Sequence, residues 1–350
     1  GLRHDVGLSF MRQRLLDRLS YKQAYNWAVT GNIDGTSDSP QAQPVPGDLN
    51  TNRSEYATEI ALRDRIELTA QTSVWLGLRH TELSRSSAKT DGSQFVSDQR
   101  SFNTPWLAAT HKLTADQTVY ASYGYGLEAQ AAPNVSNYTN AGQPLPALRS
   151  TQREVGFKRQ NQHSFWQATW FDITRPQTTN GLGCSNAVGS CTLQMDGQNH
   201  HQGLELSTLT RLSQWNLGGS AMWLDAKREN ATIQTDLNGQ RPINVPQYIL
   251  RGMTEYRYTN IVGLRSGLRV SHEGKRNVTE NGDIRLPAWT TLDATTHYDT
   301  KINNVASSWT LAINNLANKQ YWRESPRQYG QYFLYPGAPR TVRATVVFHL

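Results

Sequence analysis

The residues best suited to bind a ligand are arginines and tyrosines near the C-terminal end of the chain. The aromatic-rich segment 321–335 carries four preferred candidates, Arg323, Arg327, Tyr329 and Tyr332. Rigid aromatic rings and guanidinium groups make strong contacts with little loss of conformational entropy. We therefore expect a ligand-binding surface here, although Trp322 and Tyr335 in the same segment also suit anchoring at a membrane interface.

The two cysteines, Cys184 and Cys191, lie seven positions apart in a segment rich in Gly and Ser. This spacing suits a small disulfide-closed loop in an oxidising compartment and matches no zinc motif, although two free thiols remain the alternative. The adjacent His200 and His201, close to Glu205, would point to opposite faces of a strand. We expect no metal site there and no tightly bound cofactor.

No motif of a known catalytic class is present. The sequence lacks H-E-x-x-H, G-x-S-x-G, Walker and complete dinucleotide-binding patterns. The 35 Lys and Arg residues are spread along the chain, although the net charge is +7, so nucleic acid is not an expected partner. We expect a protein that is not an enzyme.

The composition excludes two broad classes. The 350 residues contain no apolar run near the roughly 18 that a membrane-spanning helix needs. They also contain 10 Trp, 15 Tyr and 8 Phe, which is too aromatic for a disordered chain. The chain should fold, and its elements should not be membrane-spanning helices.

Alternation of apolar and polar residues is the main local pattern. In the segment 264–270, for example, Leu264, Leu268 and Val270 alternate with polar or small residues. Such alternation predicts β-strands. About fourteen strands are predicted, at 2–12, 55–68, 73–86, 99–113, 118–127, 151–160, 163–175, 199–211, 215–228, 245–258, 262–275, 286–299, 307–321 and 340–350.

The links between these strands alternate between short and long. Short polar links such as 69–73 and 114–118 alternate with long ones such as 128–150 and 178–198. This rhythm, with aromatic residues near strand ends, predicts an all-β transmembrane antiparallel barrel. A soluble sandwich would place larger residues on its buried face, and a propeller would show a repeat of about 40 residues that is absent here.

In such a barrel, one set of arginines would face the interior. Extending the alternation places eight there: Arg63, Arg65, Arg79, Arg251, Arg257, Arg265, Arg269 and Arg343. A basic interior attracts anionic metal chelates. We single out Arg265 and Arg269 as further ligand candidates, with simple solvation as the alternative reading.

The C-terminal 160 residues resemble the barrel of a TonB-dependent outer-membrane receptor of the ferric-siderophore type. The resemblance rests on segments 196–206, 286–293, 311–322 and 335–342, with weaker similarity at 77–80 and 120–123. The residues that carry the most specific part are Asn315, Leu316, Tyr321, Pro336, Gly337, Pro339 and Arg340. We expect Asn314 and Asn315 within a strand facing a polar interior, and Pro336 and Pro339 before the last strand.

The resemblance implies a fold, a ligand and partners. The family barrel is similar to 22 strands, so residues 1–350 would be one barrel domain matching its last fourteen, with the N-terminal plug domain absent. The implied ligand is a ferric siderophore, and the implied partners are outer-membrane lipid and, through N-terminal segments of the full-length protein, the TonB complex. The implied location is the outer membrane of a Gram-negative bacterium, and such a fragment would not perform coupled uptake alone.

Two other functions remain open at this point. A self-contained, porin-like passive channel would require the first and last strands to pair and close the barrel. A secreted β-rich carbohydrate-binding protein would be soluble without detergent. Either would share the strand pattern but not the family segments.

Overall fold

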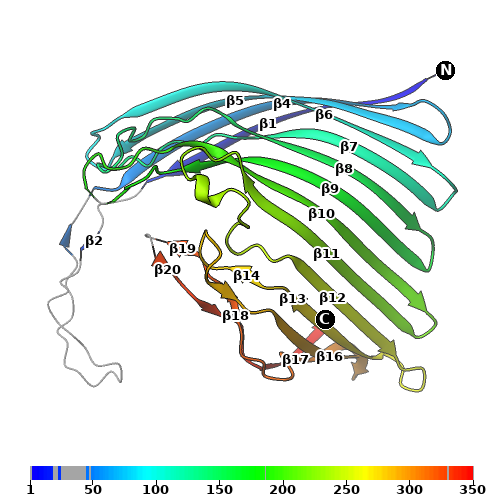
Figure 1. Cartoon of the computed structure of the whole chain (residues 1–350). Helices are drawn as coiled ribbons and strands as arrows, with labels where there is room; N and C mark the ends of the chain where they lie inside the picture. The colour runs from blue at the N-terminus through cyan, green and yellow to red at the C-terminus, as the bar shows by residue number, and fades with distance from the viewer. Residues whose placement is uncertain are drawn as a thin grey trace, which may run out of the picture.

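One curved antiparallel sheet dominates the molecule (Figure 1). The computed structural model describes residues 2–18, 23–24, 45–46, 49–185, 187–328 and 331–349. The fourteen strands of the sheet are hydrogen-bonded in chain order, and each overlaps one predicted strand. They are β1 (Arg3–Asp17), β4 (Thr51–Glu67), β5 (Thr72–Lys89), β6 (Val96–Lys112), β7 (Gln117–Glu128), β8 (Leu148–Gln160), β9 (Ser164–Thr179), β10 (Gln194–Leu212), β11 (Trp215–Glu229), β12 (Tyr248–Arg257), β13 (Leu264–Glu273), β16 (Trp289–Ile302), β17 (Val305–Asn314) and β22 (Thr341–His349).

The smaller elements lie in the connections. They are four two-stranded pairs and one short 3-10 helix, η1 (Thr235–Leu237). The pairs are β2 (Gln23–Ala24) with β3 (Val45–Pro46), β14 (Arg276–Asn277) with β15 (Arg285–Leu286), β18 (Trp322–Glu324) with β21 (Tyr335–Pro336), and β19 (Arg327–Gln328) with β20 (Gln331–Tyr332). Within the described residues, no helix has the length and apolar character to cross a bilayer.

The two faces of the sheet differ in character. Directly opposed residues share a face, so the pairing of Leu62 with Leu78 and of Leu250 with His272 traces one face across the strands. This face, which we call the outer face, exposes large apolar side chains such as Leu62 (52%) and Val155 (55%). The other, inner face carries most of the charged side chains. An exposed apolar band of this kind matches the lipid-facing surface of a membrane barrel.

The connections separate into two rims. Short turns at 68–71, 113–116, 161–163, 213–214, 258–263 and 303–304 form one rim, and the loops on the other rim are mostly longer. Both ends of the chain lie at the short-turn rim, because Arg3 pairs with Glu67 and His349 pairs with Ala306. The predicted rhythm of the connections is therefore confirmed.

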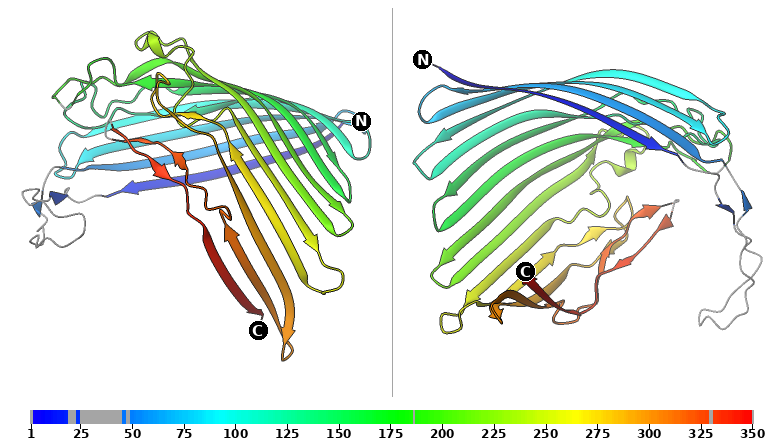
Figure 2. Two further views of the ribbon diagram at one scale, coloured as in Figure 1. Left: turned by 60° about the horizontal axis from the view of Figure 1, so that its bottom comes forward. Right: turned by 180° about the vertical axis from the view of Figure 1, so that it is seen from behind.

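The sheet is open at both sides in the part of the chain that is described. β1 pairs with β4 and β22 pairs with β17, and no pairing joins β1 to β22. Figure 2 shows these terminal strands on separate sides of the curved sheet. The passive-channel alternative required them to pair, so this arrangement does not support it.

Candidate functional site

The inner face holds a polar depression near the C-terminal strands. One row of directly paired residues crosses it: Arg211, Asn216, Glu255, Gly267, Thr295, Ala312 and Arg343. The depression has a volume of about 430 Å³, and Arg269, Asp293 and His297 also line it. Strand alternation thus gathers residues from seven strands into one polar surface.

Ion pairs neutralise only part of the predicted arginine set on this face. Arg265 Nε lies 3.8 Å from Glu255 Oε2, and its Nη1 lies 3.5 Å from Asp299 Oδ2. Arg65, Arg79 and Arg251 also pair with carboxylates. Within the described residues, Arg269 and Arg343 have no carboxylate oxygen within 4.0 Å of their nitrogens, nor does Arg211. The depression therefore keeps uncompensated positive charge, which draws anions.

The structure places the predicted ligand residues at different heights between the two rims. Arg265 follows the short turn at 258–263, whereas Arg323, Arg327 and Tyr332 lie in the last loop at the opposite rim. Arg269 lies between these levels on β13. Tyr329 is outside the described residues. The sequence could not show that these residues lie at different distances from the two rims, because it does not show exactly where each strand begins and ends.

In the last loop, the described candidates already have neighbours. Arg327 Nη1 lies 2.9 Å from Glu280 Oε1, and the Arg327 guanidinium is 5.6 Å from the Tyr332 ring centroid. Arg323 bonds the adjacent Glu324, which raises the pKa of Arg323. An anionic ligand at this loop would compete with these carboxylates.

The predicted placement of Asn315 within a strand was wrong. β17 ends at Asn314, and Asn315 takes a left-handed backbone with φ of 52°. Its side chain is only 4% exposed; Nδ2 donates to the carbonyls of Lys319 (2.9 Å) and Ala338 (3.0 Å), and Oδ1 accepts from Lys319 N–H (2.8 Å). Asn tolerates the left-handed region and can bond nearby backbone, which explains the residue type. Asn315 therefore ties the two ends of the last loop together.

The other family residues surround Asn315 at the base of this loop. The N–H of Leu316 donates to Leu292 O (2.7 Å), and that of Arg340 to Asn318 Oδ1 (3.1 Å). A Cβ on Gly337 would lie 2.0 Å from Tyr321 Cζ, so only glycine allows this ring to cover the backbone. Tyr321 also packs on Trp289, with ring centroids 4.4 Å apart, and burial raises the pKa of Tyr321. Pro336 pairs with Trp322 in β21 and β18, and Pro339 precedes β22.

Three loops lock together around this base, and we call them the C-terminal loop group: the described parts of 230–247, 274–288 and 315–340. Asn244 Nδ2 donates to Ser325 O (2.9 Å), and Ser325 N–H donates to Asn244 Oδ1 (2.7 Å). Asn244 N–H donates to Asn277 O (3.0 Å). Ser325 is fully buried. Hydrogen bonds from an asparagine thus join these irregular segments.

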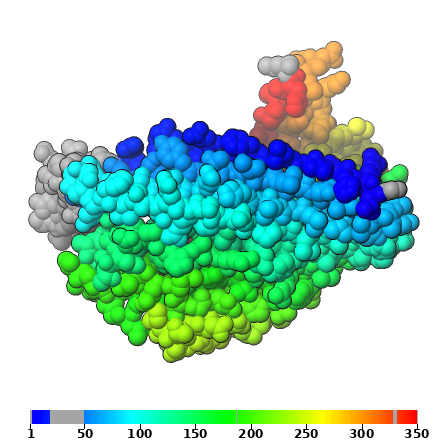
Figure 3. Space-filling view, turned by 90° about the horizontal axis from the view of Figure 1, so that it is seen from above, coloured from blue at the N-terminus to red at the C-terminus, as the bar shows by residue number. Residues whose placement is uncertain are grey.

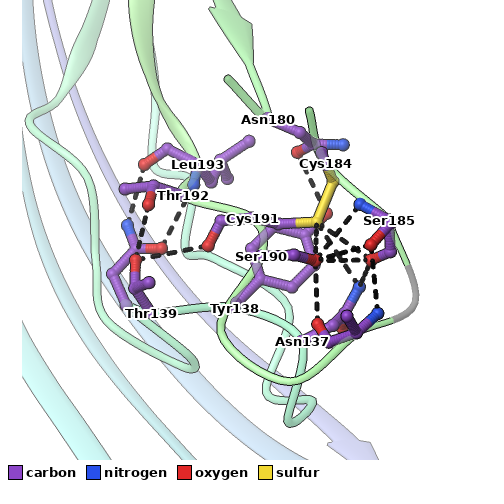
Figure 4. The surroundings of a disulfide bond; sticks show 12 residues. Asn137, Tyr138, Thr139, Asn180, Cys184, Ser185, Ser190, Cys191, Thr192 and Leu193 are labelled. Atoms are coloured by element: carbon purple, nitrogen blue, oxygen red, sulfur yellow. Dashed lines mark hydrogen bonds between the residues drawn. A yellow bond between two sulfur atoms is a disulfide. The ribbon is translucent and has the colours of Figure 1, made fainter. Parts of the chain in front are cut away.

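Two earlier loops form a second assembly, the N-terminal loop group: 129–147 and the described part of 180–193 (Figure 4). Cys184 and Cys191 are joined by a disulfide within the second loop. Asn140 exchanges two hydrogen bonds with Leu193, and Tyr138 Oη donates to Asn180 Oδ1 at 2.9 Å. Ala132, Leu145 and Leu193 form a small buried cluster below these contacts. Burial raises the pKa of Tyr138.

Asp196 anchors the loop after β11 to the start of β10. Its fully buried carboxylate accepts from the N–H groups of Thr232 (2.8 Å), Ile233 (2.9 Å) and Gln234 (3.2 Å), and from Arg228 Nη2 (3.0 Å). Four donors satisfy a charge that would otherwise be costly to bury. The family segment at 196–206 therefore begins with a structural anchor.

The two neighbouring histidines do not converge on an ion. His200 Nε2 lies 3.0 Å from Asp172 Oδ2 and its Nδ1 lies 3.2 Å from Glu229 Oε1, so both ring nitrogens are engaged. Among the described side chains, no group of three or more His, Cys, Asp or Glu could hold a metal ion.

Comparisons with known proteins identify the family. Residues 1–316 match the family model "TonB dependent receptor-like, beta-barrel". The ferrichrome receptor FcuA of Yersinia enterocolitica is 30% identical over 234 residues, covering 65% of this chain and 30% of that protein. The metal-pseudopaline receptor CntO of Pseudomonas aeruginosa is 30% identical over 162 residues, covering 45% of this chain and 22% of that protein.

Solved receptors share the fold. BauA, the ferric preacinetobactin receptor of Acinetobacter baumannii, is 22% identical with a TM-score of 0.79, over 99% of this chain and 51% of that one. The ferric citrate transporter FecA gives 14% identity and a TM-score of 0.74, over 97% and 50%. This chain thus spans about half the length of these solved receptors and a smaller share of the curated relatives. It belongs to the TonB dependent receptor-like β-barrel family, whose members are barrels of the Gram-negative outer membrane.

Proposed function

We propose that residues 1–350 are the barrel portion of a TonB-dependent receptor that takes up a ferric siderophore. The observation that carries the proposal is the sheet itself, which has an apolar outer face, a basic inner depression and long loops at one rim. Receptors named for ferrichrome and for ferric preacinetobactin are similar to it. An exposed apolar band of this extent argues against a soluble carbohydrate-binding protein.

The depression supplies the electrostatic part of the function. Arg269 and Arg343 lack carboxylate partners among the described residues, and Arg211 lines the same surface. Cations lining a concave wall focus the field and raise the local concentration of anionic ligands. In the proposed passage, a ferric chelate moves along this wall as cargo, without a resident cofactor.

The last loop supplies the capture surface. Arg323, Arg327 and Tyr332, together with Tyr329, are the proposed contacts, and their aromatic neighbours limit the entropy lost on binding. Binding of an anionic chelate by Arg327 requires this residue to exchange Glu280 for the ligand. Arg265, already held by Glu255 and Asp299, should contribute less than Arg269.

Energy for uptake is proposed to come through the TonB complex, which would contact segments outside residues 1–350. A plug domain would gate the interior, and outer-membrane lipid would surround the apolar band. The proposed activity is transport and not catalysis. These roles follow the family and need the full-length protein.

Uptake of ⁵⁵Fe-labelled siderophores by a receptor-null strain tests the proposal. The strain would express either the full-length protein that contains this chain or residues 1–350 alone, with ferrichrome, ferric preacinetobactin and ferric citrate offered separately. We expect energy-dependent uptake of one chelate with the full-length protein and none with residues 1–350. Uptake by residues 1–350 alone would overturn the proposal. Passage of uncharged sugars into liposomes carrying the full-length protein, at the same rate as the ferric siderophores, would overturn it too.

A further inference from the structure

Several arginines of the outer face have no carboxylate partner among the described residues. Inner-face arginines such as Arg85 and Arg175 pair with Glu55 (2.8 Å) and Glu128 (2.7 Å). In the described residues, four outer-face arginines have no carboxylate within 4.0 Å: Arg12, Arg14, Arg149 and Arg153. No carboxylate of the described residues therefore compensates their charge.

These arginines lie at one edge of the apolar band. On β8, Val155 is exposed on the outer face, and Arg153 and Arg149 follow on the same face toward the long-loop rim. On β1, Phe10 (67% exposed) is followed in the same direction by Arg12 and Arg14. Figure 3 shows the outer surface of the strands from β1 in blue to the green strands as one continuous wall. The cations therefore lie where hydrocarbon gives way to lipid head groups.

Aromatic rings hold two of these guanidinium groups side by side. Arg149 Cζ lies 3.6 Å from the Tyr125 ring centroid, and Arg153 Cζ lies 5.8 Å from that of Tyr123. The two tyrosines meet edge to face and share a hydroxyl hydrogen bond of 2.8 Å. Stacking orients a guanidinium without consuming its N–H donors, so the planar forks stay available for an anion.

The acidic residue directly opposite Arg153 on this face is already engaged. Asp172 is the register partner of Arg153 in the β8–β9 ladder, but Asp172 Oδ2 is bonded to His200 Nε2 at 3.0 Å. At the opposite edge of the same face, Arg159 on β8 has its own carboxylate, Asp116, at 2.9 Å. On the outer face of this strand, arginines without a carboxylate partner among the described residues thus occur only toward the long-loop rim.

We propose that Arg149 and Arg153, positioned by Tyr125 and Tyr123, bind the phosphate group of an anionic lipid in the leaflet that meets the long-loop rim. Arginine matches phosphate through paired N–H donors, and basic residues beside a membrane surface attract anionic head groups. The tyrosine rings form the apolar floor of the site. This assignment does not depend on which chelate the receptor carries.

Native mass spectrometry of the protein purified from outer membranes tests the site. Three samples would be compared, with detergent micelles that contain lipid A, its dephosphorylated form, or lipid A together with millimolar inorganic phosphate. We expect phosphorylated lipid to remain bound and its affinity to fall about tenfold or more in the Arg149→Gln/Arg153→Gln variant. Arg159→Gln, on the same strand and face at the other rim, is the matched control and should bind as the parent does.

Three results would overturn the assignment: equal retention by the double variant, equal retention of the dephosphorylated lipid, or displacement of the lipid by millimolar inorganic phosphate. The last would indicate a site for free phosphate. Each single variant, Arg149→Gln and Arg153→Gln, should lose part of the affinity, which keeps the test informative if the double variant does not fold. Far-UV circular dichroism establishes folding.

Discussion

The two loop groups of the long-loop rim are held by different chemistry. The N-terminal group combines a disulfide with a small apolar cluster and the Asn140–Leu193 bonds. In the C-terminal group, the buried amides of Asn244 and Asn315 join backbone segments from different loops. A disulfide limits the conformations of the unfolded loop, whereas a buried amide stabilises the loops only while all of its hydrogen-bond partners are in place. The C-terminal group should therefore be the more easily released by a single substitution.

The largest expected effect is that of Asn315→Ala. It removes three hydrogen bonds made by a buried side chain and leaves Lys319 N–H, Lys319 O and Ala338 O without them. At roughly 1 kcal/mol or more per bond, the loop base should lose about 3–4 kcal/mol. Hydrogen–deuterium exchange across 315–340 should rise strongly. Asn318→Ala, which removes one bond to Arg340 N–H, is the control with a smaller effect; equal exchange in both variants would contradict this account.

The Cys184→Ser/Cys191→Ser variant should have the next largest effect. Opening a loop of this length removes about 2.5 kcal/mol in the chain-entropy account. The hydrogen bonds from Asn140 and Tyr138 remain, so exchange should rise within 184–191 and little in 129–147. Loss of protection throughout both loops would show that the disulfide, and not the cluster, holds the N-terminal group.

Asn244→Ala should release one contact between loops. Its amide makes two bonds with the backbone of buried Ser325, so we expect a loss of about 2 kcal/mol between the 230–247 and 315–340 loops. Trypsin cleavage after Arg323 and Arg327 should accelerate, while cleavage after Arg149 stays unchanged. Unchanged cleavage after Arg323 would indicate that Asn315 suffices to hold the loop.

Arg327→Gln should change stability least. Its ion pair with Glu280 joins side chains 44% and 37% exposed, and such pairs contribute within about 1 kcal/mol. Under the proposed function, however, the affinity for the transported chelate should fall several-fold in a fluorescence titration. Glu280→Gln frees Arg327 and should keep or raise the affinity. Parental affinity in Arg327→Gln would remove this residue from the capture surface.

Much of the architecture could be predicted from the local sequence. Alternation located the strands, because a strand that faces lipid on one side must repeat its apolar residues with period two. The disagreement at Asn315 is instructive. A strand-like run of residues continues into it, but the left-handed turn and the bond to Ala338 become visible only when β17 and the start of β22 lie side by side.

The sequence by itself determined the strand pattern, the two kinds of rim and the family, since these depend on periodicity and on segments contiguous in the chain. Tertiary structure decided which arginines keep free charge. Arg265 and Arg269 share a strand and a face, yet only Arg265 meets Glu255 and Asp299. Likewise, only the β7–β8 pairing sets Arg153 over Tyr123. Charge compensation depends on a few ångströms between distant residues, and only strand register sets those distances.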